Sequence, residues 1–275
     1  MYLFKALYVL LYMIAAAIAV AWSLLHLWQG DWLWLAPCLL WAPLPLLNLW
    51  RFYRANLCFP DERERVVLGL GLVGLALVLV GASRGPVLWW SLAGLFSLLL
   101  FLFVVSRLNP GVREKPGDSA ALPALDFLDP RGRRVKVTDL AGVSLLVVVH
   151  AHWCPYARMA LRELRQQARQ QGLPPTSIML LFPDYLPDWC QPLIAEGFHC
   201  CYDEEGNSSQ ALGLWLRGGS SFLPGGANAL RPALAALDAD GKPVFWRVAS
   251  NYRLPPLLGD HWQRLRPLLA DRLRG

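Results

Sequence analysis

The sequence predicts an α-helical membrane region followed by an α/β domain with a central mixed sheet. The chain is 55% hydrophobic with a mean hydropathy of +0.35, which is too apolar for an ordinary soluble protein. Charges are sparse before Arg107 and frequent after it. Beyond residue 122, short β-rich runs alternate with helical patterns, as in α/β domains. We therefore expect transmembrane helices over 1–106, a linker over 107–121 and a folded domain over 122–275.

Four uncharged apolar stretches in the first region are predicted transmembrane helices, because their lengths approach what a hydrocarbon core of about 30 Å requires. These are Ala6–Trp28, Trp32–Trp50, Val66–Ala82 and Pro86–Ser106. The first is too long for a signal peptide and lacks a small-residue cleavage site, so we interpret it as an uncleaved anchor. The second contains Pro37, Pro43 and Pro45, and a re-entrant segment is the alternative there.

The distribution of basic residues predicts the orientation. Four spans place both termini and the loop 51–65 on one side, which carries Lys5, Arg51, Arg54, Arg63, Arg65, Arg107, Arg113 and Lys115. The other side carries Arg84 alone. The positive-inside rule then predicts a bacterial inner-membrane protein whose C-terminal domain is cytoplasmic, or periplasmic if the second stretch does not cross.

The residues argue against three kinds of function: nucleic-acid binding, dinucleotide binding and proton transfer across the membrane. The net charge of +6 comes without a Lys/Arg block beside exposed aromatics, so we expect no nucleic-acid partner. Gly69, Gly71 and Gly74 spell GxGxxG inside an apolar span with no preceding strand, which favours a helix-packing notch over a dinucleotide loop. No Asp, Glu, Lys or Arg lies within a span, so anchoring or partner docking is expected rather than a proton relay.

The domain is expected to contain two hairpins, further strands and several helices. The expected strands are Leu125–Leu128, Arg133–Val137, Ser144–His150, Ser177–Phe182, His199–Tyr202, Ala233–Leu237 and Pro243–Ala249. The expected helices begin at Pro155, Pro187, Ser208 and Leu257. The segment Gly218–Ala229 is rich in Gly, Ser and Pro and is predicted to be a loop near the active face.

Cys154 is the predicted chemical centre, since it lies between the apolar strand 144–150 and the helix that Pro155 begins. Pro155 suits the first helical position, which makes Cys154 the N-cap. Orphan N–H groups and the helix dipole stabilise a thiolate there, so we expect a lowered pKa and a nucleophilic thiol. The alternative is a buried structural cysteine.

The motif Trp153-Cys154-Pro155-Tyr156 resembles the redox motif of the thioredoxin superfamily, with the Pro-Tyr pair of glutaredoxins. Residues 122–275 resemble the redoxin branch related to peroxiredoxins, through Arg231-Pro232, the hairpin 238–242 and the tripeptide 251–253. The resemblance implies a thioredoxin-like fold and a thiol:disulfide oxidoreductase without cofactor. It also implies that Trp153 and Tyr156 shape the surface and that Pro232 is a cis-proline aligning the substrate. The partners would be a protein or small-thiol disulfide, the bilayer and a membrane redox protein.

The sequence departs from these families at three places. Ala157 stands where a second cysteine would follow, so no intrahelical disulfide forms. Val147 and Ala151 replace the Pro and Thr of typical peroxiredoxins, and Val148 replaces the buried Asp of thioredoxins. His150 or His152 is left as the nearest possible base, and the alternative is that each is a plain strand-end residue.

Ala157 has two explanations, a monothiol enzyme or a Cys→Ala substitution that traps a mixed disulfide. The second is favoured because Cys-Pro-Tyr-Ala is one substitution from the glutaredoxin motif. A peroxiredoxin-like peroxidase and a redox-inactive scaffold that docks a membrane partner are the alternative functions.

The other five cysteines lack the spacing of a disulfide framework or a metal site. Cys190, Cys200 and Cys201 are expected to be small hydrophobes rather than resolving thiols or ligands. Cys58 is a loop thiol that could relay a disulfide, and Cys38 lies within a span, where it packs.

Overall fold

The computed structural model describes residues 2–53, 64–81, 85–108, 122–140, 142–220 and 227–269. The chain divides into two compact units, a helical unit of Leu3–Arg107 and a sheet unit of Leu108–Gly275. Most of the predicted linker 107–121 lies outside the described residues. Leu108 belongs with the sheet unit, where its amide donates to the Ser250 carbonyl over 2.8 Å.

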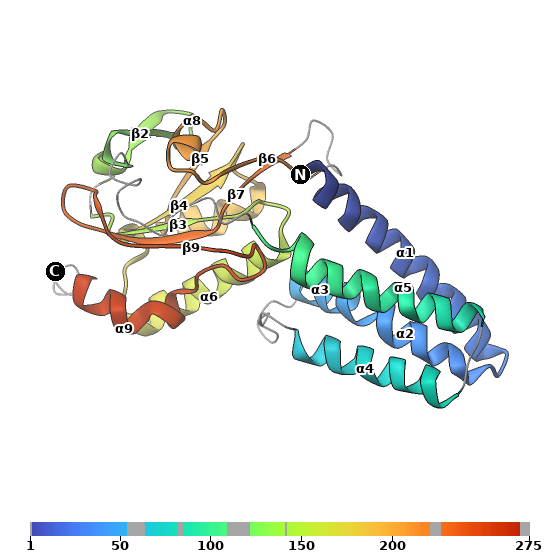
Figure 1. Ribbon diagram of the computed structural model, residues 1–275. Helices are drawn as coiled ribbons and strands as arrows, with labels where there is room; N and C mark the ends of the chain where they lie inside the picture. The colour runs from blue at the N-terminus through green and yellow to red at the C-terminus, as the bar shows by residue number, and fades with distance from the viewer. Residues whose placement is uncertain are drawn as a thin grey trace. The chain divides into compact units, whose positions relative to one another are not determined.

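The helical unit consists of apolar helices (Figure 1). Its elements are α1 (Tyr2–Trp28), η1 (Trp32–Trp34), α2 (Leu35–Trp41), α3 (Pro43–Tyr53), α4 (Arg65–Val80), α5 (Pro86–Leu100) and the π-helical turn η2 (Phe101–Val105). Large apolar side chains are exposed along these helices, including Ile18, Leu72 and Phe96. Such an apolar exterior is what a lipid environment requires.

Two helices are long and apolar enough to cross a membrane, Leu7–Trp28 and Pro86–Val105. A third span exists if Trp32–Trp41 and Pro43–Arg51 count as one, although the pair is bent by 45° at Ala42. The bend falls beside Pro43, in the stretch whose prolines weakened the prediction of a span. The fourth apolar helix, α4, has 16 residues and is about 24 Å long at 1.5 Å per residue, which is short for a span.

Glycines bring α2 close to its neighbours, as the predicted packing notch requires. A Cβ on Gly74 would lie 2.8 Å from the Ala36 carbonyl oxygen, and one on Gly71 would lie 3.3 Å from Leu40. Gly69 has nothing within 4 Å, so only two of the three glycines form the notch. On the other side of α2, the Trp41 indole N–H donates to the Trp90 carbonyl of α5 over 2.9 Å.

An ion pair between Arg51 and Glu64 is buried in the helical unit. Both guanidinium nitrogens of Arg51, near the end of α3, bond the two carboxylate oxygens of Glu64 at 2.8 and 2.9 Å. Their side chains are 2% and 4% exposed, and Glu64 caps α4 with a positive φ of 46°. The pair therefore joins the end of α3 to the start of α4.

The sheet unit is built on a seven-stranded mixed sheet of order β2-β1-β5-β4-β3-β8-β9. Its strands are β1 (Asp126–Leu128), β2 (Arg134–Lys136), β3 (Leu145–Val148), β4 (Ile178–Pro183), β5 (His199–Asp203), β8 (Ala233–Leu237) and β9 (Pro243–Val248). The central strands β3, β4 and β5 are parallel, and β8 and β9 continue the sheet antiparallel. The strands expected from the sequence are confirmed.

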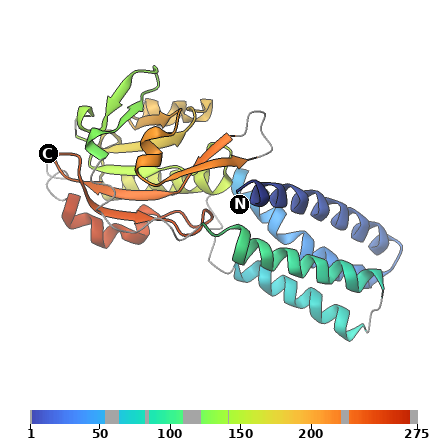
Figure 2. The same ribbon diagram turned by 45° about the horizontal axis from the view of Figure 1, so that its top comes forward.

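Helices cover both faces of this sheet (Figure 2). One core packs α6 (Pro155–Gln171), α7 (Gln191–Ala195) and α9 (Leu258–Leu269) against alternate sheet residues such as Leu145. The residues between them, such as Leu146, face the opposite core beside α8 (Asn207–Ala211). This alternation follows from the two-residue period of a strand. The 3-10 turns are η4 (Leu122–Ala124), η5 (Val137–Asp139), η6 (Pro175–Ser177) and η7 (Asp188–Cys190).

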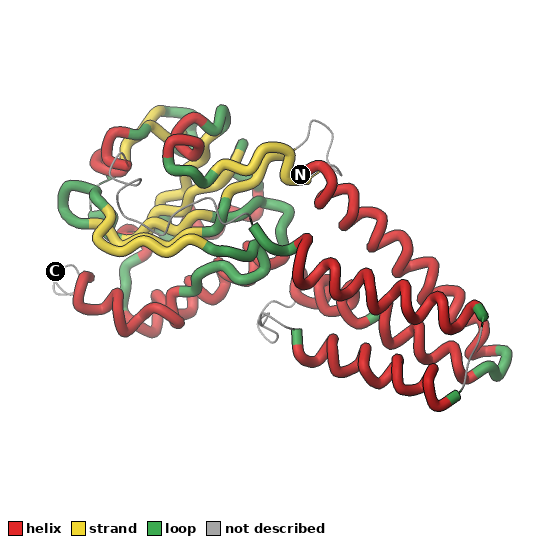
Figure 3. Tube along the Cα trace, viewed as in Figure 1, coloured by secondary structure: helices red, strands yellow, loops and turns green. Residues whose placement is uncertain are grey.

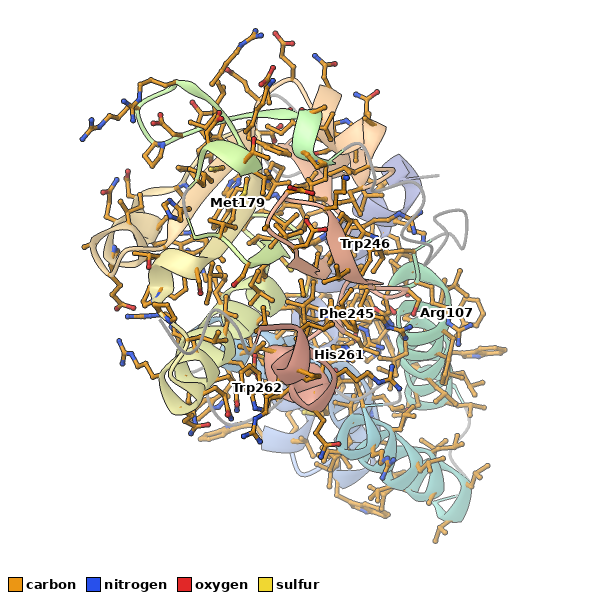
Figure 4. All side chains as sticks on the ribbon, turned by 90° about the vertical axis from the view of Figure 1, so that its left-hand side faces the viewer. Arg107, Met179, Phe245, Trp246, His261 and Trp262 are labelled. Atoms are coloured by element: carbon orange, nitrogen blue, oxygen red, sulfur yellow. The ribbon has the colours of Figure 1, made fainter. Side chains whose placement is uncertain are left out.

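Aromatic side chains of α9 pack against the last strand, β9. The ring of His261 lies 5.6 Å from that of Phe245 on β9, and Trp262 packs against the same core (Figure 4). The parallel β3-α6-β4 unit, the antiparallel β8-β9 hairpin and the closing helix α9 together form a thioredoxin-like arrangement. The predicted fold of the domain is thus observed.

The segment Gly218–Ala229 was predicted to be a loop, and this is wrong at both ends. β6 (Trp215–Ser220) and β7 (Ala227–Leu230) form an antiparallel ribbon outside the main sheet (Figure 3). Trp215 pairs with Leu230, and Leu216 pairs with Ala229. Burial of Leu216, Ala229 and Leu230 favours strand formation more than the glycines after Leu216 disfavour it. Residues 221–226, between the strands, lie outside the described residues.

Candidate active site

Cys154 lies at the junction of β3 and α6, as the sequence predicted. It is the N-cap of α6 with extended backbone angles, φ −80° and ψ 122°, and Pro155 is the first helical residue. The helix ends at Gly172, whose φ of 69° suits a residue without a Cβ. The backbone N–H of Arg158 donates to the Cys154 carbonyl over 3.3 Å, which starts the helical hydrogen-bonding pattern.

The environment of the Cys154 thiol differs from the expectation of a lowered pKa. The residue is 1% exposed, and burial raises its pKa to about 12. The backbone N–H groups of Ala157 and Tyr156 lower the pKa, but they do not offset burial. The helix N-terminus is thus present as predicted, while the closed packing around the sulfur favours the thiol.

Ala157 lies one turn further along α6 and is 4% exposed within the same core cluster as Cys154. A cysteine at this position would face the same core as the Cys154 thiol, which is the geometry of an intrahelical pair.

Aromatic rings surround the junction. The His150 ring is stacked on Tyr252 with centroids 5.3 Å apart, and the Trp153 ring meets His150 edge-on at 5.9 Å. Tyr156 meets Tyr252 edge-on at 6.0 Å. Burial raises the pKa of Tyr252, with further contributions from Tyr156 and Cys154. Tyr156 is 3% exposed, so it belongs to this packed cluster and does not shape the surface as expected, whereas Trp153 is half-buried.

The expectation of a cis-proline at position 232 is wrong, because the described residues contain no cis peptide bond. Pro232 extends β8, since its carbonyl accepts the Ala249 amide at 2.8 Å just beyond the paired residues Ala233 and Val248. A trans bond keeps this stretch extended, whereas a cis bond would shorten the Cα spacing from about 3.8 to 2.9 Å. Leu230, two residues before Pro232, donates its amide to the His150 carbonyl over 2.7 Å, so the segment still runs beside the junction.

The two candidate histidines have different surroundings. The Nδ1 of His150 bonds the Leu230 carbonyl, and burial lowers its pKa to about 4. His150 is therefore a neutral packing residue. His152 is also buried, but its Nε2 shares a 2.7 Å hydrogen bond with the Tyr185 hydroxyl, and its buried Nδ1 has no hydrogen-bond partner among the described residues.

An acidic residue completes the surroundings of His152. Burial lowers the pKa of His152, Asp184 raises it and Arg158 lowers it. Asp184 has a positive φ of 56°, and its carboxylate accepts the backbone and side-chain N–H groups of Asn228 at 2.7 and 2.8 Å. A non-glycine residue in this region is strained, and such residues cluster at functional sites.

Tyr185 and Asp184 were not identified from the sequence. They directly follow β4, whose parallel neighbour β3 is followed by His150 and His152. The residues after two adjacent parallel strands meet at one sheet edge, and this relationship was the available signal.

The three further cysteines of the sheet unit that the structure describes are buried. Cys190 and Cys200 lie in the core cluster that contains Cys154, and Cys201 faces the opposite core. Burial raises the pKa of each to about 12. Cys38 is half-buried in α2, and Cys58 lies outside the described residues. Among the described residues, no group of three or more His, Cys, Asp or Glu side chains gathers as a metal site would require.

No protein-family model matches the sequence, and no curated protein sequence matches it. Among solved structures, a peroxiredoxin-like protein from Aquifex aeolicus is 12% identical with a TM-score of 0.40, over 52% of this chain and 82% of that one. A putative thiol:disulfide interchange protein DsbE from Chlorobium tepidum is 16% identical with a TM-score of 0.34, over 55% and 95%. Reduced Prx3 from Vibrio vulnificus, in complex with H2O2, is 18% identical with a TM-score of 0.37, over 46% and 84%. Similarities this distant assign no activity, so the strand order carries the thioredoxin-like assignment.

Proposed function

We propose that this protein is a membrane-anchored thiol:disulfide oxidoreductase in which Cys154 is the nucleophile. The observation that supports the proposal is the position of Cys154 between the central strand β3 and the 17-residue helix α6. Ligands and reactive groups gather at the carboxyl ends of the strands in open α/β sheets. The backbone N–H groups of Tyr156 and Ala157 favour the thiolate at this end of the helix.

The reaction is thiol–disulfide exchange. The Cys154 thiolate attacks one sulfur of a substrate disulfide, a new S–S bond forms to Cys154, and the substrate S–S bond breaks. The departing sulfur leaves as a thiolate and is reduced, while Cys154 is oxidised into a mixed disulfide. Because position 157 is alanine, the second exchange needs an external thiol, which releases the mixed disulfide and is itself oxidised.

Access to the sulfur requires rearrangement, since Cys154 is 1% exposed. Trp153 and Tyr252 lie at the junction with Cys154, and their displacement would expose the thiol and relieve the burial that raises its pKa. In this account His152 accepts the thiol proton, and Pro232 guides the substrate backbone in its trans form. Pro155 fixes the first turn of the helix.

The helical unit anchors the protein. We propose four crossings, in which α2 and α3 form one bent span and α4 is completed by flanking residues. With four crossings, the excess of basic residues beside the termini and the loop 51–65 favours a cytoplasmic sheet unit in an inner membrane.

A redox-inactive scaffold is the second candidate function, and one observation favours it. The Cys154 thiol is as buried as Cys200 and Cys201, each 1% exposed, and burial raises all three pKa values to about 12. Buried structural thiols are inert, so a scaffold would keep the fold without the chemistry.

The test is the formation of a mixed disulfide at Cys154 in the full-length protein in detergent micelles. A neutral small disulfide is added, and peptide mass spectrometry determines which cysteine carries the adduct. The proposal expects an adduct on Cys154 that an added thiol releases, and none at that peptide in Cys154→Ser. An unmodified Cys154 would favour the scaffold. Sulfenic acid formed with hydrogen peroxide, without reaction with disulfides, would favour a peroxidase instead.

A further inference from the structure

A cationic groove runs along α6 beside the Cys154 junction. It has a volume of about 180 Å³ and is lined by Arg158, Leu161, Arg162, Arg165, Trp189, Pro192 and Leu193. Pockets that enclose a whole drug-sized ligand start near about 300 Å³, so this groove fits one end of a ligand rather than all of it. The rest of such a ligand would lie outside the groove.

Three of the residues that line the groove are arginines. Its three arginines are spaced at i, i+4 and i+7, which places them on one face of α6. Glu196 forms an ion pair with Arg165, and it lies 3.3 Å from Arg169 outside the groove. The groove lining itself contains three guanidinium groups and no carboxylate.

The Trp189 ring lies beside one of these guanidinium groups, that of Arg158. The Arg158 guanidinium carbon lies 5.0 Å from the centroid of the Trp189 ring, a cation–π geometry. Arg158 and Arg165 are half-buried, and Arg162 is exposed at the mouth. A guanidinium is a planar fork of N–H donors, and a carboxylate matches that fork.

The groove begins one helical turn from the proposed nucleophile. The Arg158 amide bonds the Cys154 carbonyl, and four residues of helix advance about 6 Å along the axis. The charge of Arg158 also lowers the pKa of His152, the proposed base, after the larger effect of burial. A ligand with a carboxylate a few bonds from a disulfide could occupy the groove while its sulfur faces Cys154.

We propose that the groove binds a carboxylate of the substrate, so that small disulfides carrying carboxylates are the preferred substrates. This inference rests on the proposed function. The carboxylate bonds Arg158 and Arg162, and Trp189 forms the wall beside it. The disulfide then undergoes the exchange with Cys154 described above, and the leaving half departs as a thiolate that still carries its own carboxylate.

The experiment measures the rate of adduct formation at Cys154 in the full-length protein in detergent with three disulfides. Dithiodiglycolate carries two carboxylates, bis(2-hydroxyethyl) disulfide is neutral, and cystamine carries two ammonium groups. Each rate is divided by the rate of the same disulfide with free cysteine, which removes intrinsic reactivity. Arg162→Gln is compared with Arg169→Gln, because both residues are exposed on α6 and only Arg162 lines the groove.

We expect the normalised rate of dithiodiglycolate to exceed that of cystamine about tenfold at low salt, and the difference to shrink as ionic strength rises. Arg162→Gln should lower the dithiodiglycolate rate about threefold, the effect of one exposed ion pair, and leave the neutral disulfide unchanged. Arg169→Gln should change none of the three rates.

Two results overturn the inference while the proposed function stands. Equal normalised rates for all three disulfides would mean that charge is not recognised. Equal losses in Arg162→Gln and Arg169→Gln would mean that the general charge of the chain, and not the groove, attracts the anion. If Cys154 reacts with none of the disulfides, including the neutral one, the proposed function itself is wrong, and the inference with it.

Discussion

The Nε2 of His152 and the hydroxyl of Tyr185 share a hydrogen bond of 2.7 Å, although the residues follow different strands. The two residues meet because β3 and β4 are parallel neighbours. His152 is two residues before Cys154, and burial lowers its pKa, so it is neutral near pH 7 and able to accept a proton. His150, whose Nδ1 bonds the Leu230 carbonyl, is committed to packing.

His152→Gln should therefore slow adduct formation at Cys154 by at least about tenfold near pH 7, since a general base typically contributes more than that. In the unmodified protein the rate should fall in acid, at a pH below the ordinary imidazole pKa of about 6.5 because burial lowers the pKa of His152, as this base becomes protonated. The measurement is the pH dependence of the exchange rate. His199→Gln, which changes a half-buried histidine on β5, is the control and should leave the profile intact. An unchanged profile in His152→Gln would exclude His152 as the base.

His150 should make the sheet unit sensitive to acid. Its pKa is lowered to about 4 from 6.5 by burial, so between these values the unfolded chain binds a proton that the folded chain does not. The stability is therefore complete above about pH 6.5 and declines as the pH falls, by about 2 kcal/mol between pH 6.5 and 5. The stability at each pH can be measured as the urea concentration at which half of the Cys201 thiols become accessible to alkylation.

His150→Phe should lose most of this pH dependence, because phenylalanine cannot take up a proton and can stack on Tyr252 as the imidazole does. The variant forfeits the hydrogen bond to Leu230, so its stability at pH 7 should be somewhat lower. An equally steep acid dependence in His150→Phe would assign the effect to other groups.

The packing notch of the helical unit gives a matched pair of substitutions. Gly74→Ala would place a methyl group 2.8 Å from the Ala36 carbonyl, whereas Gly69→Ala meets nothing within 4 Å. We expect Gly74→Ala to destabilise the helical unit by about 1–3 kcal/mol, as overpacking does, and Gly69→Ala to be neutral or slightly stabilising. Thermal unfolding in detergent compares the two. Equal transition temperatures would mean that α2 and α4 are not in close contact.

Removing one member of the ion pair between Arg51 and Glu64 should destabilise the helical unit more than replacing both members. Glu64→Gln leaves a buried guanidinium without its carboxylate, and breaking such a pair costs about 3–5 kcal/mol. Replacing both residues, as Arg51→Met with Glu64→Met, should cost much less, because no charge remains to be buried. Proteolysis of the full chain in detergent reports the loss. A double variant as susceptible as Glu64→Gln would contradict this reasoning.

The sequence predicted the sheet unit better than the site. The strands follow from runs such as Leu145–Val148, in which both faces are buried and all residues are apolar. The position of Cys154 followed from Pro155 and the apolar face of α6. The pKa of Cys154 could not be predicted, because it depends on how closely distant segments pack around the sulfur.

Other features depend on contacts that sequence spacing does not encode. Tyr252 comes from a segment almost a hundred residues beyond Cys154 in sequence, and no local pattern indicates that its ring would stack on His150. The trans peptide at Pro232 reflects pairing between β8 and β9 that continues through Ala249. Four spans were expected from apolarity, the second being the weakest because of its prolines, whereas the 45° bend at Ala42 and the 16-residue length of α4 came from the structure.

The central claim is tested most directly by the relative reactivity of three equally buried thiols. Cys154, Cys200 and Cys201 are each 1% exposed, and burial raises the pKa of each to about 12, but only Cys154 caps a long helix. In the folded full-length protein at pH 7, alkylation followed by peptide mass spectrometry gives the rate at each site. We predict that Cys154 reacts at least about tenfold faster than the two strand cysteines, because its site opens and the helix N-terminus then stabilises the thiolate. Equal rates at all three would make Cys154 a structural cysteine and contradict the assignment of an oxidoreductase.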